Sequence, residues 1–426
     1  MTSATPASTS ASLANLTIDA DRLWGTLMET ARFGATPKGG VRRLALSEED
    51  RQVRDWFRAA CEAAGLSVSI DALGNMFALR PGRDMSLPPL GIGSHLDTQP
   101  TGGKFDGILG TLAALEVVRT LNDAGIETEA PLCIVNWTDE EGSRFALAMM
   151  GSAGHAGVLP LADILARTDA KGVSVGDALD AIGYRGEAKL GAQKLGGFLE
   201  LHIEQGPILE AEGVTIGVVE HGQGIIWYDG RIAGFASHAG STPMPLRRDA
   251  LAALSEVVLA VEALAVKHGP NAVGTVGEVV IENPSRNVIP GDLAFSCEFR
   301  TPDADILEAL DTGLAAAVAG ISARRKVTIA LDTIFRKAPT HFDPQMIGTV
   351  AAAAGKLGFS HRPIVSGAGH DAFHMATIMP TGMIFVPCKD GVSHNELEDA
   401  TPADCAAGAN VLLHAVLALI GEPARP

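Results

Sequence analysis

The segment from residue 90 to residue 142 restricts the fold of this chain more than any other, because two short apolar runs each lead directly into a polar motif. The first run (LGIG) precedes SHLD at 94–97, and the second (LCIV) precedes NWTDEEG at 136–142. Between them, leucine and valine recur at helical spacing from Gly107 to Gly125. The alternation of strand, motif, helix, strand and motif predicts an α/β fold, in which ligands gather beyond the ends of the strands.

The middle of the chain follows a different pattern, which alternates like a strand from residue 225 and then becomes helical. The further elements that we expect there are a helix over 248–267, strands over 275–282 and 292–299, and a helix over 303–320. The order β-α-β-β-α-β suggests an inserted module of ferredoxin-like type. After Lys337 helices and strands return, and the chain ends in an apolar helix over 402–420.

Three parts of the chain follow from these patterns. A discontinuous α/β catalytic domain is predicted at 21–216 and 336–426, and a ferredoxin-like α+β domain at 217–335 is inserted into it. Residues 1–20 are rich in Ser, Thr and Ala, and we expect them to be a disordered segment.

Five side chains stand at expected transitions from strand to loop, within glycine-rich and otherwise apolar stretches. They are the candidate metal ligands His95, Asp106, Glu141, His202 and His394. One histidine or one Asp-Gly pair is usually structural, but their common setting favours a metal site. Imidazole and carboxylate ligands suit Zn, Mn, Co or Ni, and the lack of cysteine ligands excludes a structural zinc site.

Two metal ions about 3.5–4 Å apart need a bridging carboxylate and further ligands on each side. Asp97, two residues after His95, is predicted to orient that imidazole by a hydrogen bond. Glu140 and Glu141 are adjacent, so at a strand end one can be a ligand while the other is a general base. A base beside metal-activated water is what hydrolysis requires.

Two other motif matches lack the structural context that their chemistry needs. GVSVG at 172–176 fits the pattern of serine hydrolases, but the polar residues 167–171 before it cannot form the required apolar strand. GAGHDA at 367–372 fits a dinucleotide-binding pattern, but the segment that ends at Pro380 is too short for the crossover helix. A glycine turn that presents His370 or Asp371 is the favoured interpretation.

The composition restricts the partners and the compartment. Lys+Arg total 33 against Asp+Glu 50, a formal net charge of −17, which argues against a nucleic-acid partner. We find no unbroken apolar run of about 18 residues and expect no membrane span. The five cysteines are scattered without a CxxC pair, so we expect reduced thiols and a cytoplasmic protein.

With these residues in view, the chain resembles the amidohydrolase branch of the M20 metallopeptidase family. That branch includes N-carbamoyl-L-amino-acid hydrolases, β-ureidopropionases and allantoate amidohydrolases. The resemblance extends from about Asp21 to about Leu419. It rests on the motifs at 93–100, 102–107, 136–145, 200–210, 237–240, 287–291, 298–300 and 393–396.

The resemblance implies a role for each candidate residue. Asp106 would bridge two divalent metal ions, with His95 and His202 on one ion and Glu141 and His394 on the other. Glu140 would be the general base and acid. The implied substrate-binding residues are Gln205, His238, Asn287 and Arg300. His238 would polarise the carbonyl oxygen, while the other three would hold a substrate carboxylate.

The family fold implies that the smaller domain is a lid that also forms a homodimer. Whether His238 acts in its own subunit or in trans stays open. The implied reaction is hydrolysis of the ureido C–N bond of an N-carbamoyl-L-amino acid or N-carbamoyl-β-alanine, giving the amino acid, ammonia and carbon dioxide. Allantoate or a related ureido acid is the alternative substrate, and an M20-type dipeptidase ranks third.

Overall fold

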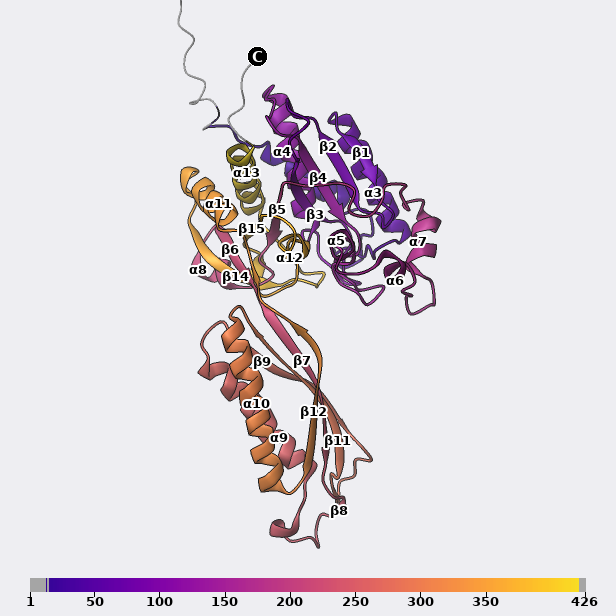
Figure 1. Cartoon of the computed structure of the whole chain (residues 1–426), viewed down its shortest axis with the longest axis vertical. Coiled ribbons are helices and arrows are strands. Elements are labelled where there is room, and N and C mark those ends of the chain that lie inside the picture. The colour runs from indigo at the N-terminus through magenta and orange to yellow at the C-terminus, as the bar shows by residue number, and fades with distance from the viewer. Residues whose placement is uncertain (1–12, 14, 421–426) are drawn as a thin grey trace, which may run out of the picture. The chain divides into compact units, whose positions relative to one another are not determined.

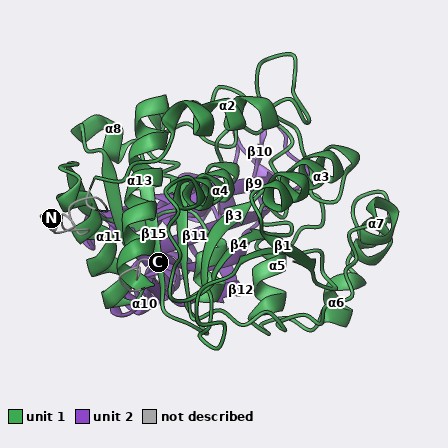
Figure 2. Cartoon of the chain, turned by 90° about the horizontal axis from the view of Figure 1, so that it is seen from above, with its two compact units in different colours: residues 1–220, 342–426 green, residues 221–341 purple. Residues whose placement is uncertain are grey.

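The computed structural model describes residues 13 and 15–420, which divide into two compact units (Figure 1, Figure 2). The first unit contains residues 1–220 and 342–426, and the second contains residues 221–341. The chain therefore leaves the first unit and returns to it once, as expected for an inserted domain.

One mixed sheet forms the centre of the first unit, with nine strands within the described residues. The order is β1-β2-β4-β3-β5-β15-β6-β13, and β14 also pairs with β6. The strands are β1 (Ser67–Ile70), β2 (Met76–Arg80), β3 (Leu90–His95), β4 (Leu132–Trp137), β5 (Gly197–Ile203), β6 (Ile216–Gly222), β13 (Thr340–His341), β14 (His361–Ser366) and β15 (Thr381–Val386). Neighbours among β4, β3, β5 and β15 run parallel, whereas the pairs β1–β2, β2–β4, β15–β6 and β6–β13 are antiparallel.

Helices cover both faces of this sheet. The α-helices of the first unit are α2 (Ala20–Thr30), α3 (Glu48–Ala63), α4 (Ile108–Asp123), α5 (Met150–His155), α6 (Leu161–Leu165), α7 (Val175–Ile182), α8 (Ile208–Glu212), α11 (Pro344–Lys356), α12 (Asp371–Met375) and α13 (Pro402–Leu419). Helices α4, α11 and α13 pack on one face, and α5 and α12 pack on the other. A short 3₁₀ helix, η2 (Lys389–Gly391), follows β15.

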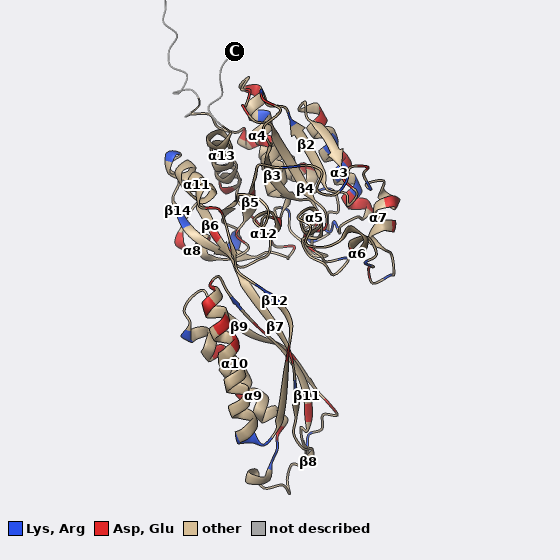
Figure 3. Cartoon of the chain, viewed as in Figure 1, with Lys and Arg blue, Asp and Glu red and all other residues tan. Residues whose placement is uncertain are grey.

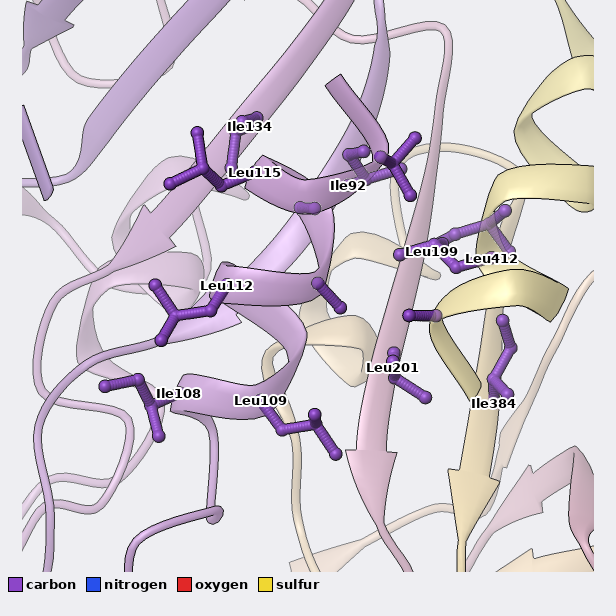
Figure 4. Close-up of a cluster of buried hydrophobic side chains, with 14 of the residues drawn as sticks. Ile92, Ile108, Leu109, Leu112, Leu115, Ile134, Leu199, Leu201, Ile384 and Leu412 are labelled. Carbon is purple, nitrogen blue, oxygen red and sulfur yellow. The ribbon is translucent and has the colours of Figure 1, made fainter. Parts of the chain in front are cut away.

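The parallel strands are buried along their whole length and are mostly apolar, because helices cover both faces of the sheet. Ile384 of β15 packs with α4 and α13, while its neighbours Met383 and Phe385 belong to the cluster on the other face. Figure 4 shows Leu109 and Leu112 of α4 on the first of these faces, with strand and α13 side chains nearby. The continuous apolar runs that the sequence shows are therefore central strands of a three-layer α/β fold.

The second unit is an antiparallel sheet with two helices on one face. Its elements in chain order are β7 (Gly224–Ala233), β8 (Ser237–His238), η1 (Met244–Leu246), α9 (Ala250–Lys267), β9 (Val273–Ile281), β10 (Val288–Ile289), β11 (Asp292–Thr301), α10 (Ala304–Arg325) and β12 (Thr328–Lys337). The main sheet has the order β12-β7-β11-β9, and β8 pairs with β10. The predicted order β-α-β-β-α-β is confirmed.

The second unit begins four residues later and ends six residues later than the predicted range 217–335 (221 − 217 = 4 and 341 − 335 = 6). Gly217, the predicted first residue of the second unit, lies within β6 and pairs with Phe385 of the first sheet. A methyl group there would lie 2.9 Å from Ile364, so Gly217 serves close packing within the first unit. At the other end, β12 stays paired with β7 as far as Lys337.

The predicted disordered segment 1–20 is only partly testable, because residues 1–12 and 14 lie outside the described residues. For residues 15–20 the prediction is wrong. Ile18 is 6% exposed, and its backbone N–H donates to Oδ1 of Asn410 in α13 at 3.0 Å. Leu16 and Asp19 also contact the first unit, because the Leu16 carbonyl oxygen lies 2.9 Å from Nε2 of His414 and the Asp19 N–H donates to Glu116 at 3.1 Å. The composition of the segment did not reveal these contacts with distant parts of the chain.

Charged residues of both signs occur in both units. Figure 3 shows acidic and basic residues interspersed over both. The five cysteines are free and buried. Two helices, α10 and α13, have the length and composition of a membrane span, and each packs within its own unit, α13 against α4 and α11 and α10 against α9.

Candidate metal centre

The candidate ligands lie at the carboxyl ends of four adjacent parallel strands, the edge where α/β sheets bind ligands. His95 is the last residue of β3, and His202 is the last but one of β5. Glu140 and Glu141 follow the end of β4, and His394 lies in the loop after β15. Asp106 precedes α4. Pairing of β4 with β3, β3 with β5 and β5 with β15 brings these distant segments together.

Asp106 lies between two sets of ligands. Its Oδ1 is 3.5 Å from Nε2 of His95 and 3.1 Å from Nε2 of His202. Its Oδ2 is 3.4 Å from Nε2 of His394, and the same nitrogen is 3.3 Å from Oε2 of Glu141. One carboxylate therefore offers each of its oxygens to a different group of side chains, as a bridging ligand of two metal ions does.

The two buried histidines among the candidate ligands, His95 and His202, have the tautomer that metal binding needs. Nδ1 of His95 lies 3.0 Å from the backbone oxygen of Asp97, and Nδ1 of His202 lies 2.9 Å from that of Ile203. A carbonyl oxygen only accepts hydrogen bonds, so each Nδ1 bears a proton, and in the neutral ring, which is the form that binds metal, each Nε2 keeps its lone pair. The predicted orientation of His95 by Asp97 thus operates through the main chain, whereas the carboxylate is 3.8 Å away.

The Asp97 carboxylate has a different task from the predicted one. Its two oxygens accept the backbone N–H groups of Glu140 and Glu141, each at 3.3 Å. The side chain of Glu141 is held in turn by Gln99, whose amide donates to Oε2 at 2.6 Å. The loop after β3 therefore fixes the acidic pair that follows β4.

Burial and charge shift the protonation of the bridging region. Burial opposes ionisation of Asp106, yet the neighbouring imidazoles of His202, His394 and His95 hold its pKa well below the ordinary value. The hydrogen bond with Asp106 raises the pKa of His394 to about 9. In the absence of metal, this carboxylate is thus an anion surrounded by imidazoles that favour protonation.

The acidic pair behaves in the opposite way. Burial, partly offset by His95, raises the pKa of Glu140 well above its ordinary value. Burial likewise raises the pKa of Glu141 to about 7. Glu140 is 7% exposed, and its Oε2 lies 3.6 Å from Nε2 of His95. A carboxyl group whose pKa is raised by burial suits a general base that later acts as an acid.

The backbone is strained at this site. Asp139, Gln205 and His394 have φ values of 55°, 56° and 55°, a conformation that costs energy for residues other than glycine. Gly107 also has a positive φ, and a methyl group on it would lie 2.2 Å from the His95 ring. Such strain clusters where the surrounding structure must hold side chains in a required geometry.

The residues present fit a pair of divalent metal ions. Nε2 of His95 is buried and has no hydrogen-bond partner among residues 13 and 15–420, although its lone pair faces Asp106 and Glu140. Two groups of three possible ligand atoms, each within 4.8 Å of one another, share Asp106. They are His95, Asp106 and His202, and Asp106, Glu141 and His394. Three imidazoles and two carboxylates form a donor set for Zn, Mn, Co or Ni.

Four supporting side chains escaped the sequence analysis as functional residues. Ser94 donates to the buried carboxylate of Glu200 at 2.6 Å, and the other Glu200 oxygen accepts the backbone N–H of Ala372. His370 stacks edge-on against His202, with ring centroids 4.4 Å apart. Glu398 contacts the loop of Asp106. Their closeness in the sequence to the predicted ligands could have indicated three of them. Ser94, Glu200 and Glu398 each lie within four residues of a predicted ligand.

Gln205 is the predicted substrate-binding residue that the structure places in the first unit. Its amide nitrogen lies 2.8 Å from Oδ2 of Asp106, 3.2 Å from Oγ of Ser393 and 3.3 Å from Nε2 of His394. Its side-chain amide therefore lies next to the candidate metal ligands Asp106 and His394.

The other predicted substrate-binding residues lie in the second unit. His238 and Asn287 are exposed neighbours, because β8 pairs with β10 and the Ala239 N–H donates to the Asn287 carbonyl oxygen at 2.9 Å. Arg300 lies on β11 and pairs side-on with Glu298, from Nε to Oε1 and from Nη2 to Oε2, each at 3.0 Å. The Trp227 indole donates to the same Oε2 at 2.6 Å.

Known proteins resemble this chain over almost its whole length. Residues 91–418 match the model of the peptidase family M20/M25/M40. An N-carbamoyl-L-amino-acid amidohydrolase of Rhizobium meliloti is 47% identical over 403 residues, which cover 95% of this chain and 97% of that protein. A ureidoglycolate hydrolase of Oryza sativa subsp. japonica is 35% identical over 411 residues, with 94% and 85% covered.

A solved structure shares the fold closely. The crystal structure of an amidase of the hydantoinase/carbamoylase family from Burkholderia multivorans superposes with a TM-score of 0.93 at 51% identity, and covers 96% of this chain and 100% of that chain.

Proposed function

The chain belongs to the peptidase family M20/M25/M40, and from this premise we propose that it is a metal-dependent amidohydrolase of N-carbamoyl amino acids. It would cleave the ureido C–N bond of an N-carbamoyl-L-amino acid or of N-carbamoyl-β-alanine with water and release the amino acid, ammonia and carbon dioxide. The observation that carries the proposal is the position of Asp106, whose two oxygens face two separate sets of ligands. A ureido carbonyl is a poor electrophile, because both nitrogens donate into it, so the reaction needs strong polarisation of the carbonyl.

Two divalent ions are proposed per subunit, of zinc, manganese, cobalt or nickel. His95 and His202 would hold one ion with Oδ1 of Asp106, and His394 and Glu141 would hold the other with Oδ2. When bound, such ions lower the pKa of water and polarise a carbonyl oxygen.

Glu140 is the proposed general base. Its carboxylate lies beside His95 without being needed as a ligand, and burial raises its pKa, so it holds a proton more readily than an exposed carboxylate does. It would take the proton from the attacking water and deliver it to the leaving nitrogen. The Asp97 carboxylate accepts the backbone N–H of Glu140 and so holds this residue in place for both steps.

His238 is the proposed donor to the carbonyl oxygen. Its Nδ1 accepts the backbone N–H groups of Gly240 and Ser241 at 3.0 and 3.1 Å, so in the neutral ring the proton lies on Nε2. That N–H is available to an oxygen on which negative charge develops. Whether it serves its own subunit or a neighbour is open.

Arg300, Asn287 and Gln205 are proposed to hold the substrate carboxylate. Glu298 occupies the side-on edge of the Arg300 guanidinium, which leaves its Nη1 N–H groups for a second carboxylate. A planar fork with fixed orientation favours a carboxylate in one geometry.

A related ureido acid is the second candidate substrate. The relative from Oryza sativa is named a ureidoglycolate hydrolase, and allantoate carries the same ureido and carboxylate groups. The same residues would hold such a substrate. A dipeptidase activity ranks third.

A homodimer formed through the second unit is also proposed. Strand β9 is the edge of its sheet and exposes Val279 and Val280, which are 46% and 51% exposed. On α9, Leu259 and Val266 are 63% and 74% exposed. An apolar edge strand beside an apolar helix face suits a second copy of the chain. A cytoplasmic location, which the five free cysteines support, stays a prediction.

The test is ammonia release by metal-reconstituted protein from N-carbamoyl-L-amino acids, N-carbamoyl-β-alanine and allantoate, with a chelator-treated control. Chelator-sensitive turnover of a carbamoyl amino acid is the expected result. Turnover of allantoate alone would replace the substrate and keep the site. Inactivity on all of them would overturn the proposal and lead to simple dipeptides as the next substrates.

A further inference from the structure

A buried carboxylate outside the predicted ligand set connects the two loops that carry Asp106 and His394. Glu398 is 4% exposed, and its Oε1 accepts the backbone N–H groups of Phe105 and Asp106, each at 3.0 Å. Its Oε2 accepts the hydroxyl of Ser393, also at 3.0 Å. A single side chain thus bonds the backbone of one candidate ligand and the residue before another.

The Ser393 hydroxyl extends this connection to the bridging carboxylate itself. Its oxygen lies 2.9 Å from Oδ2 of Asp106, although the two residues are 287 positions apart in the sequence. The hydroxyl has one proton, which it shares between Glu398 and Asp106. Glu398 therefore acts on Asp106 twice, through the main chain and through Ser393.

The loop of Asp106 needs such a partner. Phe105 and Asp106 are buried and lie outside any strand or helix, so no regular ladder receives their N–H groups. A buried N–H group without an acceptor costs roughly 1–3 kcal/mol. Both groups converge on one Glu398 oxygen, which fixes the main chain from which the Asp106 side chain projects.

A glycine makes room for this carboxylate. A methyl group on Gly103 would lie 2.2 Å from Cδ and Oε1 of Glu398 and 2.4 Å from its Cβ. No ordinary contact is that close, so any side chain at position 103 would displace Glu398. Gly103 has no left-handed φ, so alanine there tests this contact and not a backbone conformation.

We propose that Glu398 is a positioning residue of the metal centre, which holds Asp106 and the His394 loop in the relative placement that two bridged ions require. Gly103 is the residue that admits it. This inference rests on the proposed metal site, because it takes Asp106 and His394 as ligands. Glu398 itself donates no ligand atom and touches no substrate.

The first experiment compares metal binding by wild-type protein and Glu398→Ala. Equilibrium dialysis and the visible absorption of Co²⁺ report the number of ions, their affinity and their coordination without any substrate. We expect one of the two ions to bind about 10- to 100-fold more weakly, with a changed Co²⁺ spectrum. Excess metal should restore part of the lost activity, which it would not do for a protein with a damaged fold.

Glu398→Gln separates shape from charge. A glutamine oxygen can still accept both backbone N–H groups, and its amide can donate to Ser393, which then donates to Asp106. We therefore expect a smaller loss of affinity than with alanine. If Glu398→Ala does not fold, folded Gly103→Ala protein decides the matter, since weaker metal binding supports the proposal and unchanged affinity contradicts it.

A double-mutant cycle with Gly103 gives the sharpest test. Gly103→Ala should weaken metal binding in the wild-type background, because its methyl group displaces the carboxylate. The second background is Glu398→Gly, because alanine would keep the Cβ atom that lies 2.4 Å from this methyl group. In Glu398→Gly protein the methyl group meets neither the carboxylate nor Cβ, so its further effect should be small. Equal effects of Gly103→Ala in both backgrounds would show that the glycine does not act through Glu398.

Asp399→Ala is the matched control, since it removes an exposed carboxylate one residue further along the chain. Its metal affinity and Co²⁺ spectrum should equal those of wild-type protein. If wild-type protein itself binds no metal, the proposed function fails. If wild-type protein binds two ions and Glu398→Ala binds them equally well, only the role of Glu398 is refuted.

Discussion

The two units place their functional side chains in opposite ways. In the first unit the candidate ligands are mostly buried and tied to one another and to the main chain, as with Asp106 and Asp97. In the second unit His238 and Asn287 are exposed, and their contacts are with neighbouring residues of the same loops. The metal site thus needs a rigid surrounding, whereas the residues proposed to recognise substrate stay open to solvent.

Removal of metal should have the largest effect and should affect the first unit alone. Chelation is expected to abolish turnover, and added Zn, Mn, Co or Ni should restore it. Bound ions stabilise the fold that binds them, by about 4 kcal/mol when the free metal is 1,000-fold above its Kd. Calorimetry should therefore show a lower unfolding temperature for one transition. A chelator-treated protein with full turnover would contradict the proposed chemistry.

Glu140→Gln should follow in size. The loss of the general base should lower kcat by about 10²- to 10⁴-fold. Metal content should stay at the wild-type level, because Glu140 is not a proposed ligand, and elemental analysis checks this. Glu129→Gln, an exposed residue paired with Arg83, is the control. Full turnover of Glu140→Gln protein with both ions bound would remove the proposed mechanism.

Arg300→Lys tests the second unit, and its effect should be smaller. Lysine cannot form the side-on pair with Glu298 or offer a second planar edge, so we expect a decrease in kcat/KM of about 10- to 100-fold, mainly in KM. Arg231→Lys, an exposed pair of Glu282, should leave kcat/KM unchanged. A change confined to kcat would place Arg300 with the chemistry and so weaken the contrast between the units.

The smallest effect concerns the pH dependence of the metal-free first unit. The folded pKa of His394, about 9, is above its ordinary value of 6.5, so its contribution to stability is present below pH 6.5 and disappears as pH rises through 9. Glu141, with a pKa raised to about 7, acts in the same direction. The metal-free protein should therefore unfold at a lower temperature at pH 9 than at pH 6.

Metal binding should release protons over the same range, because a histidine ligand must be neutral. A sensitive pH electrode in unbuffered solution measures this release. His394→Ala protein should release fewer protons and should show a flatter dependence of its unfolding temperature on pH. A wild-type protein that takes up protons with the metal would refute the assigned shifts.

The sequence predicted the strand-end positions of the ligands, because an apolar run that ends in a polar motif can be read locally. It predicted less well where a contact depends on distant segments. The role of Asp97 was assigned to its carboxylate two residues from His95, while the structure uses that carboxylate for Glu140 and Glu141. Glu398 was missed because its partners, Phe105 and Asp106, are remote in the sequence.

Local sequence patterns also could not predict the boundary between the two units. Gly217 marks the predicted start of the second unit, but it pairs with Phe385, which lies on a strand much later in the chain. The order at Ile18 could not be predicted for the same reason. The acceptor of its backbone N–H, Asn410, lies in α13, near the other end of the chain. A serine-rich composition says little about one residue that packs into a core.

The strand order has a consequence for how the protein is made. Strand β15 pairs with β5 on one side and β6 on the other, yet it is synthesised after the whole second unit. Until residues 381–386 leave the ribosome, the nascent sheet has an open slot with two unpaired strand edges. The second unit is a contiguous segment and can fold before that moment. The edge of the sheet where the candidate ligands meet is therefore completed only after the second unit has been synthesised.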